Sequence, residues 1–251
     1  MFEKITNDII EFIRDYYTKN NLKGAVIGVS GGKDSSVVLT LFTRALGSNN
    51  VKAIWIPCHS KRRDYLDAKK IAKFNNVELI THDITNLYDS FVECFKINNK
   101  ENDKYLEDSN INIKPRLRMS TLYYYAQYFS KKDNGIYLVP GTSNKSEIFV
   151  GYFTKGGDNV CDIKVLSDLL VSEVIEVGRS LGIDESLLNK IPDDGLSGKS
   201  DEDKLGIKYS EIEDYLKSIE IDKNSKDIIE RLHRINSHKF NIPEYRRNHW
   251  E

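Results

Sequence analysis

The chain has 251 residues, with 37 Lys and Arg against 38 Asp and Glu. This balance gives no overall basic field of the kind that nucleic-acid binders use against phosphates, so we expect small-molecule partners and no nucleic acid. The length favours one domain over two, and we expect residues 1–251 to form it.

The three cysteines are Cys58, Cys94 and Cys161, an odd number at wide spacing. They exclude a disulfide framework and a zinc-like pattern, and they favour a reducing cytoplasm. The N-terminal stretch "MFEKITNDIIEFIRDYY" places charges every few residues, unlike a signal peptide. No run approaches the roughly 18 apolar residues of a membrane span. We therefore expect a cytoplasmic protein that does not contact a membrane.

Helix-like and strand-like patterns alternate along the chain. Ile9, Phe12, Ile13 and Tyr16 have helical spacing and predict an amphipathic helix. Three short β-rich runs follow, each leading into a helix-period stretch, at residues 24–29, 51–57 and 77–84, and a fourth strand is expected at 136–142. This alternation predicts an α/β fold, with a parallel sheet and helices on both of its faces.

The remaining segments are predicted as follows. The polar stretch 96–114 is expected to be a surface loop, with a helix over 116–129 after it. Ser167 is expected to cap a helix that runs to about Leu181. Gly, Ser and charged residues dominate 191–204, which predicts a lid or binding loop. Two helices, 207–219 and 223–236, are expected before a basic tail.

The stretch "GVSGGKDSSVV", residues 28–38, lies between two apolar runs. A strand that ends in a Gly-rich turn and leads into a helix exposes backbone N–H groups at the positive end of the helix dipole, which is a site for an anion such as phosphate. Only three residues separate Gly28 from Gly32, and Asp34 follows Lys33, so Walker A is excluded. GxGxxG fails because position 30 is Ser. The remaining alternative is a tight turn without a ligand.

"SGGKDS" resembles the SGGxDS pyrophosphate loop of the ATP pyrophosphatases, enzymes that split ATP between its α and β phosphates. The resemblance implies a Rossmann-like adenine nucleotide α-hydrolase fold. It also implies that Asp34 binds Mg2+, in agreement with the preference of Mg2+ for one or two carboxylates plus phosphate oxygens. The loop residues expected to bind ATP are Gly28, Val29, Ser30, Gly31, Gly32, Lys33, Asp34 and Ser35.

Five later motifs occur in the order found in ammonia-dependent NAD synthetases, and the resemblance covers nearly the whole chain. They are "NIKPRLRM" (112–119), "GTSNKSE" (141–147), "GYFTKGGD" (151–158), "SDEDKLGIKY" (200–209) and "HKFNIP" (238–243). The resemblance implies that Thr142 contacts ATP and that Glu147 is a second Mg2+ ligand. It also implies that deamido-NAD is bound by Arg116, Lys155, Asp162, His238 and Lys239.

The reaction implied by this resemblance is the adenylation of the nicotinate carboxylate of deamido-NAD by ATP, followed by amidation with ammonia, which arrives free or from another chain. Asp34 and Asp162 are the expected catalytic residues, and Asp162 could orient ammonia or accept its proton. Catalysis of this kind depends on positioning and electrostatics, so it requires no Ser-His-Asp or Cys-His nucleophile. The family forms homodimers, and we expect a dimer here.

Three positions depart from the family pattern. The chain has "GDNVCD" (157–162) where the family has a glycine-rich turn, Val171 where it has a lysine that contacts ATP, and Asp193 where it has Thr or Ser. Either neighbours such as Lys145, Lys164 or Lys199 compensate for the altered charge, or the chain is a divergent ligase that adenylates another carboxylate. A third reading is a non-catalytic nucleotide-binding protein.

Overall fold

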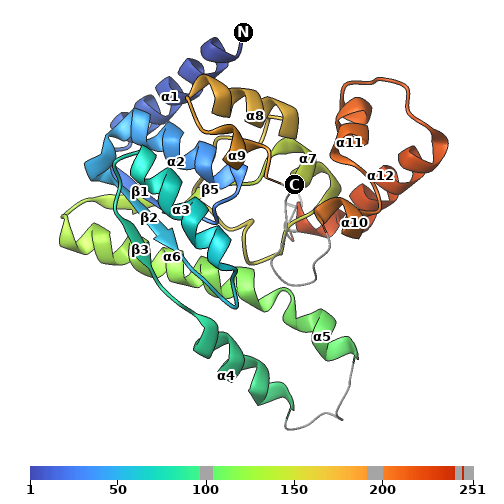
Figure 1. The fold of residues 1–251 in the computed structure, drawn as a ribbon, viewed down its shortest axis with the longest axis horizontal. Helices are drawn as coiled ribbons and strands as arrows, with labels where there is room; N and C mark the ends of the chain where they lie inside the picture. Colours follow the sequence, from blue (N-terminus) through green and yellow to red (C-terminus); the bar gives the residue numbers. More distant parts are fainter. Residues whose placement is uncertain (97–103, 191–199, 241–244, 246–251) are drawn as a thin grey trace, which may run out of the picture.

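The computed structural model describes residues 1–96, 104–190, 200–240 and 245. Its centre is a parallel sheet of four strands in the order β3-β2-β1-β4 (Figure 1). The α/β class and the parallel sheet are confirmed. The strands are β1 (Leu22–Gly28), β2 (Val51–Trp55), β3 (Leu79–Thr81) and β4 (Ile136–Leu138). A second parallel pair joins β5 (Pro140–Gly141) to β6 (Ile163–Lys164).

Helices cover both faces of the four-stranded sheet, as predicted. On one face, α1, α2 and α8 pack against one another, and Ile13, Ile27 and Leu39 belong to their shared core. On the other face, α6 contributes Ala126 and Phe129, which pack with Val26 of β1. The helices named so far, with α3 and α9 beside them, are α1 (Phe2–Lys19), α2 (Lys33–Leu46), α3 (Arg62–Phe74), α6 (Ile113–Lys132), α8 (Val171–Ser180) and α9 (Glu185–Leu188).

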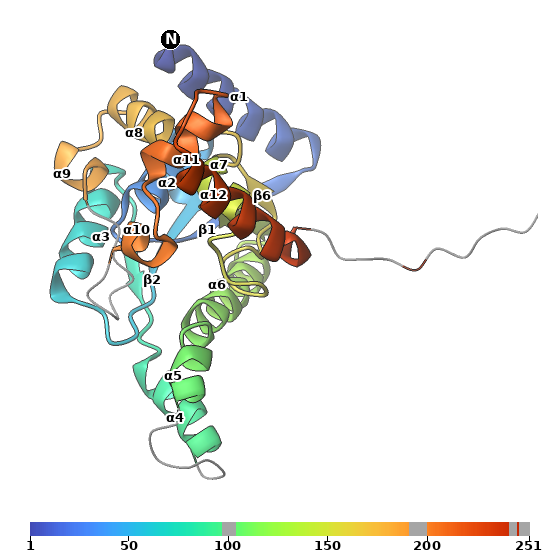
Figure 2. The ribbon, with the colours of Figure 1, turned by 90° about the vertical axis from the view of Figure 1, so that its right-hand side faces the viewer.

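A third apolar cluster joins the short helix α7 to the C-terminal helices, which lie together beside the sheet (Figures 1 and 2). Val150 of α7 packs there with Leu205, Ile212 and Ile229, which are all buried. The elements concerned are α7 (Lys145–Val150), α10 (Asp201–Leu205), α11 (Tyr209–Leu216), α12 (Lys223–Ile235) and the 3-10 turn η2 (Ser237–Lys239). The C-terminal helices therefore pack against α7, in the segment that follows β5.

Two segments expected to lack structure contain helices. The predicted loop 96–114 includes α5 (Lys104–Asn110) and the start of α6, while 97–103 lie outside the described residues. The other segment, 191–204, is helical from Asp201, because Ser200 accepts a hydrogen bond from the backbone N–H of Asp203 and forms a capping box with it. Residues 191–199 are likewise outside the described part of the chain.

The predicted start of the helix after Ser167 was wrong. Helix α8 begins at Val171, with Leu170 as its N-cap. The carboxylate of Glu213 caps it instead, accepting hydrogen bonds from the Ser172 N–H (2.8 Å) and hydroxyl (2.5 Å). A cap supplied from α11 leaves no local signal in the sequence.

The other elements are α4 (Thr85–Lys96) and the 3-10 turn η1 (Ser48–Asn50). Within the described part of the chain, no helix is long and apolar enough to cross a membrane.

Candidate active site

The turn after β1 forms an ordered loop at the start of α2. The Ser35 hydroxyl accepts a hydrogen bond from the Ser30 N–H at 3.2 Å, and the two hydroxyls lie 3.1 Å apart. The N-cap of α2 is Gly32, which has no side chain to satisfy the first N–H groups of the helix. The positive end of a 14-residue helix is therefore open to an anion.

Gly31 is required at the centre of this loop. Its φ of +80° is in the left-handed region that favours glycine. A Cβ atom at this position would lie 2.7 Å from the carbonyl oxygen of Asp64 and 2.9 Å from the Cβ of Asp67. The loop therefore packs directly against the first turns of α3.

Asn144 brings the two predicted Mg2+ ligands together. Its side-chain amide donates to Asp34 Oδ1 at 3.1 Å, and its Oδ1 accepts from the Glu147 N–H at 3.0 Å. Glu147 Oε2 in turn accepts from the Asn144 N–H at 3.2 Å, which completes a capping box at the start of α7. Asn144 is fully buried, so these contacts fix its orientation.

Asp34, Glu147 and Lys33 form a compact group of ionisable side chains. Burial, and then the nearby charge of Asp34, raise the pKa of Glu147 well above its ordinary value. Lys33 Nζ lies 3.1 Å from Asp34 Oδ2, with only 6% of its side chain exposed. Burial lowers the pKa of Lys33, but the charges of Asp34 and Glu147 outweigh that effect, and the net pKa is raised. The two carboxylates thus face a buried cation.

Tyr209, at the start of α11, lies close to Lys33. Its ring centroid is 6.0 Å from Lys33 Nζ, within the range of a cation–π contact. Its hydroxyl is buried and has no hydrogen-bond partner in the described structure. A buried polar group without a partner marks a place that a bound molecule or water could satisfy.

The carboxylate pair is chemically suited to Mg2+, which commonly takes one or two carboxylates and completes its shell with water and phosphate oxygens. In residues 1–96, 104–190 and 200–240, no group of three or more His, Cys, Asp or Glu side chains could hold a metal ion by itself. Asp34 and Glu147 would supply two oxygen ligands to such an ion.

Four of the residues expected to bind deamido-NAD lie in one hydrogen-bonded group. The Arg116 guanidinium donates from Nε and Nη2 to the Lys155 carbonyl, at 3.3 Å each. Lys155 Nζ donates to the His238 carbonyl at 2.9 Å. Lys239 Nζ donates to the carbonyls of Gly151 and Phe153. These bonds join the start of α6, the segment after α7 and η2, which are far apart in the sequence.

Asp162, the fifth of these residues, is held by different partners, Tyr123 and Val139. Its Oδ1 accepts a hydrogen bond from the Tyr123 hydroxyl at 3.0 Å, and its Oδ2 accepts from the Val139 N–H at 2.7 Å. Each oxygen keeps a further lone pair. Thr142 directly follows β5 and lies two residues before Asn144, the N-cap of α7.

The structure also locates Val171, one of the three departures from the family pattern. Val171 packs in the apolar cluster of α7 and the C-terminal helices. Lys145, one of the expected compensating residues, is paired at 2.9 Å with the exposed Asp168. Asp193 and Lys199 lie outside the described residues. The cation buried at the carboxylates is Lys33, which was expected only as a member of the loop.

Asn144, Tyr209 and Tyr123 were not singled out from the sequence. Asn144 carried a readable signal, because Asn followed three residues later by Glu is a capping-box pattern. Tyr209 ends one of the quoted motifs, but nothing local shows that it reaches Lys33. Tyr123 lies in an aromatic run, "TLYYYAQYF". The periodicity of this run does not show which of its tyrosines contacts Asp162.

Comparisons with known proteins identify the family. The model of the NAD synthase family matches residues 5–248. An NH3-dependent NAD+ synthetase of Finegoldia magna is 38% identical over 239 residues, covering 95% of this chain and 93% of the relative.

Two solved structures at 29% identity share the fold. An NMN synthetase from Francisella tularensis superposes with a TM-score of 0.87 and covers 98% of both chains. An NH3-dependent NAD synthetase from Campylobacter jejuni, in complex with the nitrate ion, gives 0.76 over 98% of this chain and 99% of the other. The chain therefore belongs to the family of NH3-dependent NAD+ synthetases.

Proposed function

We propose that the protein is an NH3-dependent NAD+ synthetase that uses ATP to amidate deamido-NAD. The observation that carries the proposal is the meeting of the phosphate loop with Asp34 and Glu147, which Asn144 holds by hydrogen bonds to both. A helix N-terminus open to phosphate beside two carboxylates suited to Mg2+ can stabilise the charge that develops on ATP when a carboxylate attacks it.

The reaction has two displacements. A nicotinate carboxylate oxygen forms a bond to the α-phosphorus of ATP, and the bond from that phosphorus to pyrophosphate breaks. Ammonia then forms a C–N bond at the acyl carbon, the C–O bond to AMP breaks, and ammonia loses a proton. Arg116, Lys155, His238 and Lys239 are proposed to bind deamido-NAD, and the loop with Thr142 to bind ATP. Asp162 is proposed to orient the incoming ammonia.

Mg2+ is part of this proposal. Bound between Asp34, Glu147 and the phosphates, it would neutralise charge on the leaving pyrophosphate. Lys33, the Asn144 amide and the open N-terminus of α2 are the protein's own contributions to the same task. Lys33 and Asn144 are each held by contacts to Asp34, and donors held in place in this way stabilise developing charge.

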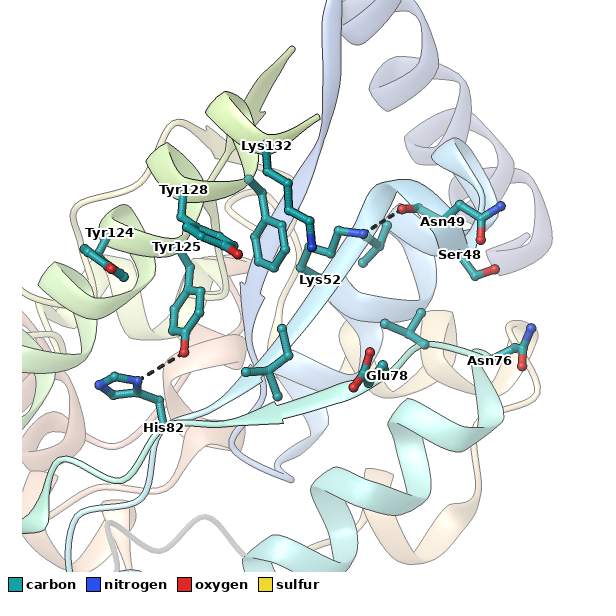
Figure 3. Close-up of a pocket in the computed structure, with 14 residues that line it drawn as sticks. Ser48, Asn49, Lys52, Asn76, Glu78, His82, Tyr124, Tyr125, Tyr128 and Lys132 are labelled. Atoms are coloured by element: carbon teal, nitrogen blue, oxygen red, sulfur yellow. Dashed lines mark hydrogen bonds between the residues drawn. The ribbon is translucent and has the colours of Figure 1, made fainter. Parts of the chain in front are cut away.

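We also propose that residues 1–251 act as one cytoplasmic domain that forms a homodimer. Cys58, Cys94 and Cys161 are free, as a reducing compartment would require. Beside α6, the sheet face carries a cavity of about 760 Å³ (Figure 3). Tyr124 and Tyr128 of α6 are 64% and 48% exposed at its edge. A second copy could cover this face.

The dimer is tested by the mass of the protein in solution. Light scattering after gel filtration should give twice the chain mass for wild type and the mass of one chain for Tyr128→Glu. A wild-type protein that stays monomeric across the concentrations used in the activity assay would exclude this part of the proposal.

A second candidate is suggested by the TM-score of 0.87 to an NMN synthetase, against 0.76 to the Campylobacter NAD synthetase. The same loop and carboxylates would then activate the nicotinate carboxylate of a mononucleotide. The two candidates share their chemistry and differ in the part of the substrate beyond the first phosphate.

One experiment separates them. The purified protein is incubated with ATP, Mg2+ and ammonium, and with either deamido-NAD or nicotinate mononucleotide, and pyrophosphate and the amide product are measured together. NAD+ formation that disappears in Asp34→Ala is the expected result. A strong preference for the mononucleotide would favour the second candidate, and no amide from either acid would contradict both.

A further inference from the structure

Lys190 links the end of α9 to the phosphate loop. Its ammonium lies 2.8 Å from Asp64 Oδ1, 2.7 Å from Asp67 Oδ2 and 3.4 Å from the carbonyl oxygen of Gly31. The side chains of Lys190, Asp64 and Asp67 are 15%, 24% and 19% exposed. One largely buried cation therefore contacts two carboxylates and the central residue of the loop.

Without Lys190, the two carboxylates would oppose phosphate binding. Asp64 and Asp67 are in the first turns of α3, which the loop touches at Gly31. Negative charges juxtaposed with an anion in a partly buried site are strongly unfavourable. Arg63 offers little compensation, because its Nε is 3.9 Å from Asp67 and its side chain is 76% exposed to solvent.

We propose that Lys190 is a positioning residue for ATP, which neutralises Asp64 and Asp67 and fixes Gly31 so that the loop accepts the pyrophosphate part of the nucleotide. The inference rests on the proposed function in taking ATP as the ligand of the loop. The ligand group concerned is a polyphosphate, so the effect of Lys190 is expected on the phosphates and not on the adenosine part.

The test is equilibrium binding of Mg-ATP and of adenosine to Lys190→Met and Lys190→Arg. For Lys190→Met, we expect the Kd for ATP to rise about tenfold or more, with the Kd for adenosine unchanged. Lys190→Arg should recover most of the ATP affinity. Adding Asp64→Asn and Asp67→Asn to Lys190→Met should also recover it, because the uncompensated charges are then absent.

Lys70→Met is the matched control. Lys70 also connects α3 to the start of α9, through Asp184 at 2.9 Å and the Ser186 hydroxyl at 3.1 Å, and within the described part of the chain its side chain does not hydrogen-bond to the loop. This variant should bind ATP like wild type. Thermal unfolding of every variant establishes that each is folded when binding is measured.

Three results would overturn the inference. The first is equal ATP affinity in Lys190→Met and wild type, and the second is an equal loss of ATP and adenosine affinity, which indicates a general structural role. The third is failure of the charge-neutral triple variant to regain ATP affinity. Binding is measured without turnover, so wild type that binds ATP but forms no amide would contradict the proposed function and leave this inference standing.

Discussion

Gly31→Ala tests whether the phosphate loop depends on its close contact with α3. Alanine at a φ of +80° carries a backbone cost of about 1–3 kcal/mol. Its Cβ would meet the Asp64 carbonyl oxygen at 2.7 Å and the Asp67 Cβ at 2.9 Å. Such overpacking adds about 1–3 kcal/mol. The free energy of unfolding should therefore fall by about 2–6 kcal/mol, and for a chain of this size 3 kcal/mol lowers Tm by about 6–12 °C.

Gly47→Ala separates the two contributions. Gly47 follows the other end of α2 and has a φ of +81°, but an added Cβ would meet no atom of the described structure within 4 Å. The free energy of unfolding of Gly47→Ala should therefore fall only by the backbone cost of about 1–3 kcal/mol.

Thermal unfolding and ATP-dependent pyrophosphate release are measured for both glycine variants. We expect Gly31→Ala to be the less stable and to lose turnover, while Gly47→Ala keeps it. The reasoning is refuted if Gly31→Ala is as stable as Gly47→Ala and turns over like wild type.

Three further predictions concern the carboxylates. Asn144→Ala removes a helix cap and a donor to Asp34, so the free energy of unfolding should fall by about 1–2 kcal/mol. The Mg2+ concentration needed for half-maximal activity should also rise, and an unchanged Mg2+ titration would contradict this. Tyr123→Phe frees Asp162 Oδ1 and should raise KM for deamido-NAD but not for ATP, and equal shifts in both would count against the assignment. The pKa of Glu147 is raised above its ordinary 4.5, so the folded state keeps a proton that the unfolded state has already lost at higher pH. The free energy of unfolding without Mg2+ should therefore fall as pH rises from the ordinary pKa to the raised one. Glu147→Gln should lack this fall when Tm is followed from about pH 5 to about pH 9, and a parallel profile would show that another group is responsible.

The sequence predicted the sheet well, because each strand carries its own pattern. Ala25, Val26 and Ile27 are fully buried, as the apolar run before the glycine turn indicated. The glycine turn between β1 and α2 was predicted for a similar reason, since its glycines and its place between strand and helix are local features.

Contacts between distant segments were not predictable in this way. The Glu213 cap of α8 comes from a helix 41 residues later, and Lys190 meets Gly31 across 159 residues. Periodicity and turn chemistry describe neighbours along the chain, and the partners of a charged side chain depend on the folded arrangement. Resemblance to a family gave residue roles, but it did not single out Lys33 as the cation buried at the carboxylates.

The packing of the short helix α7 has a consequence for folding during synthesis on the ribosome. The helix carries Asn144 and Glu147 at its start, and Val150 at its end packs against Leu205, Ile212 and Ile229. A growing chain on the ribosome therefore completes its phosphate loop early, but the residues that enclose α7 emerge only near the end of synthesis. Domains fold as units during synthesis once their residues are available. The nascent protein would thus acquire a finished active site only when almost the whole chain has been translated.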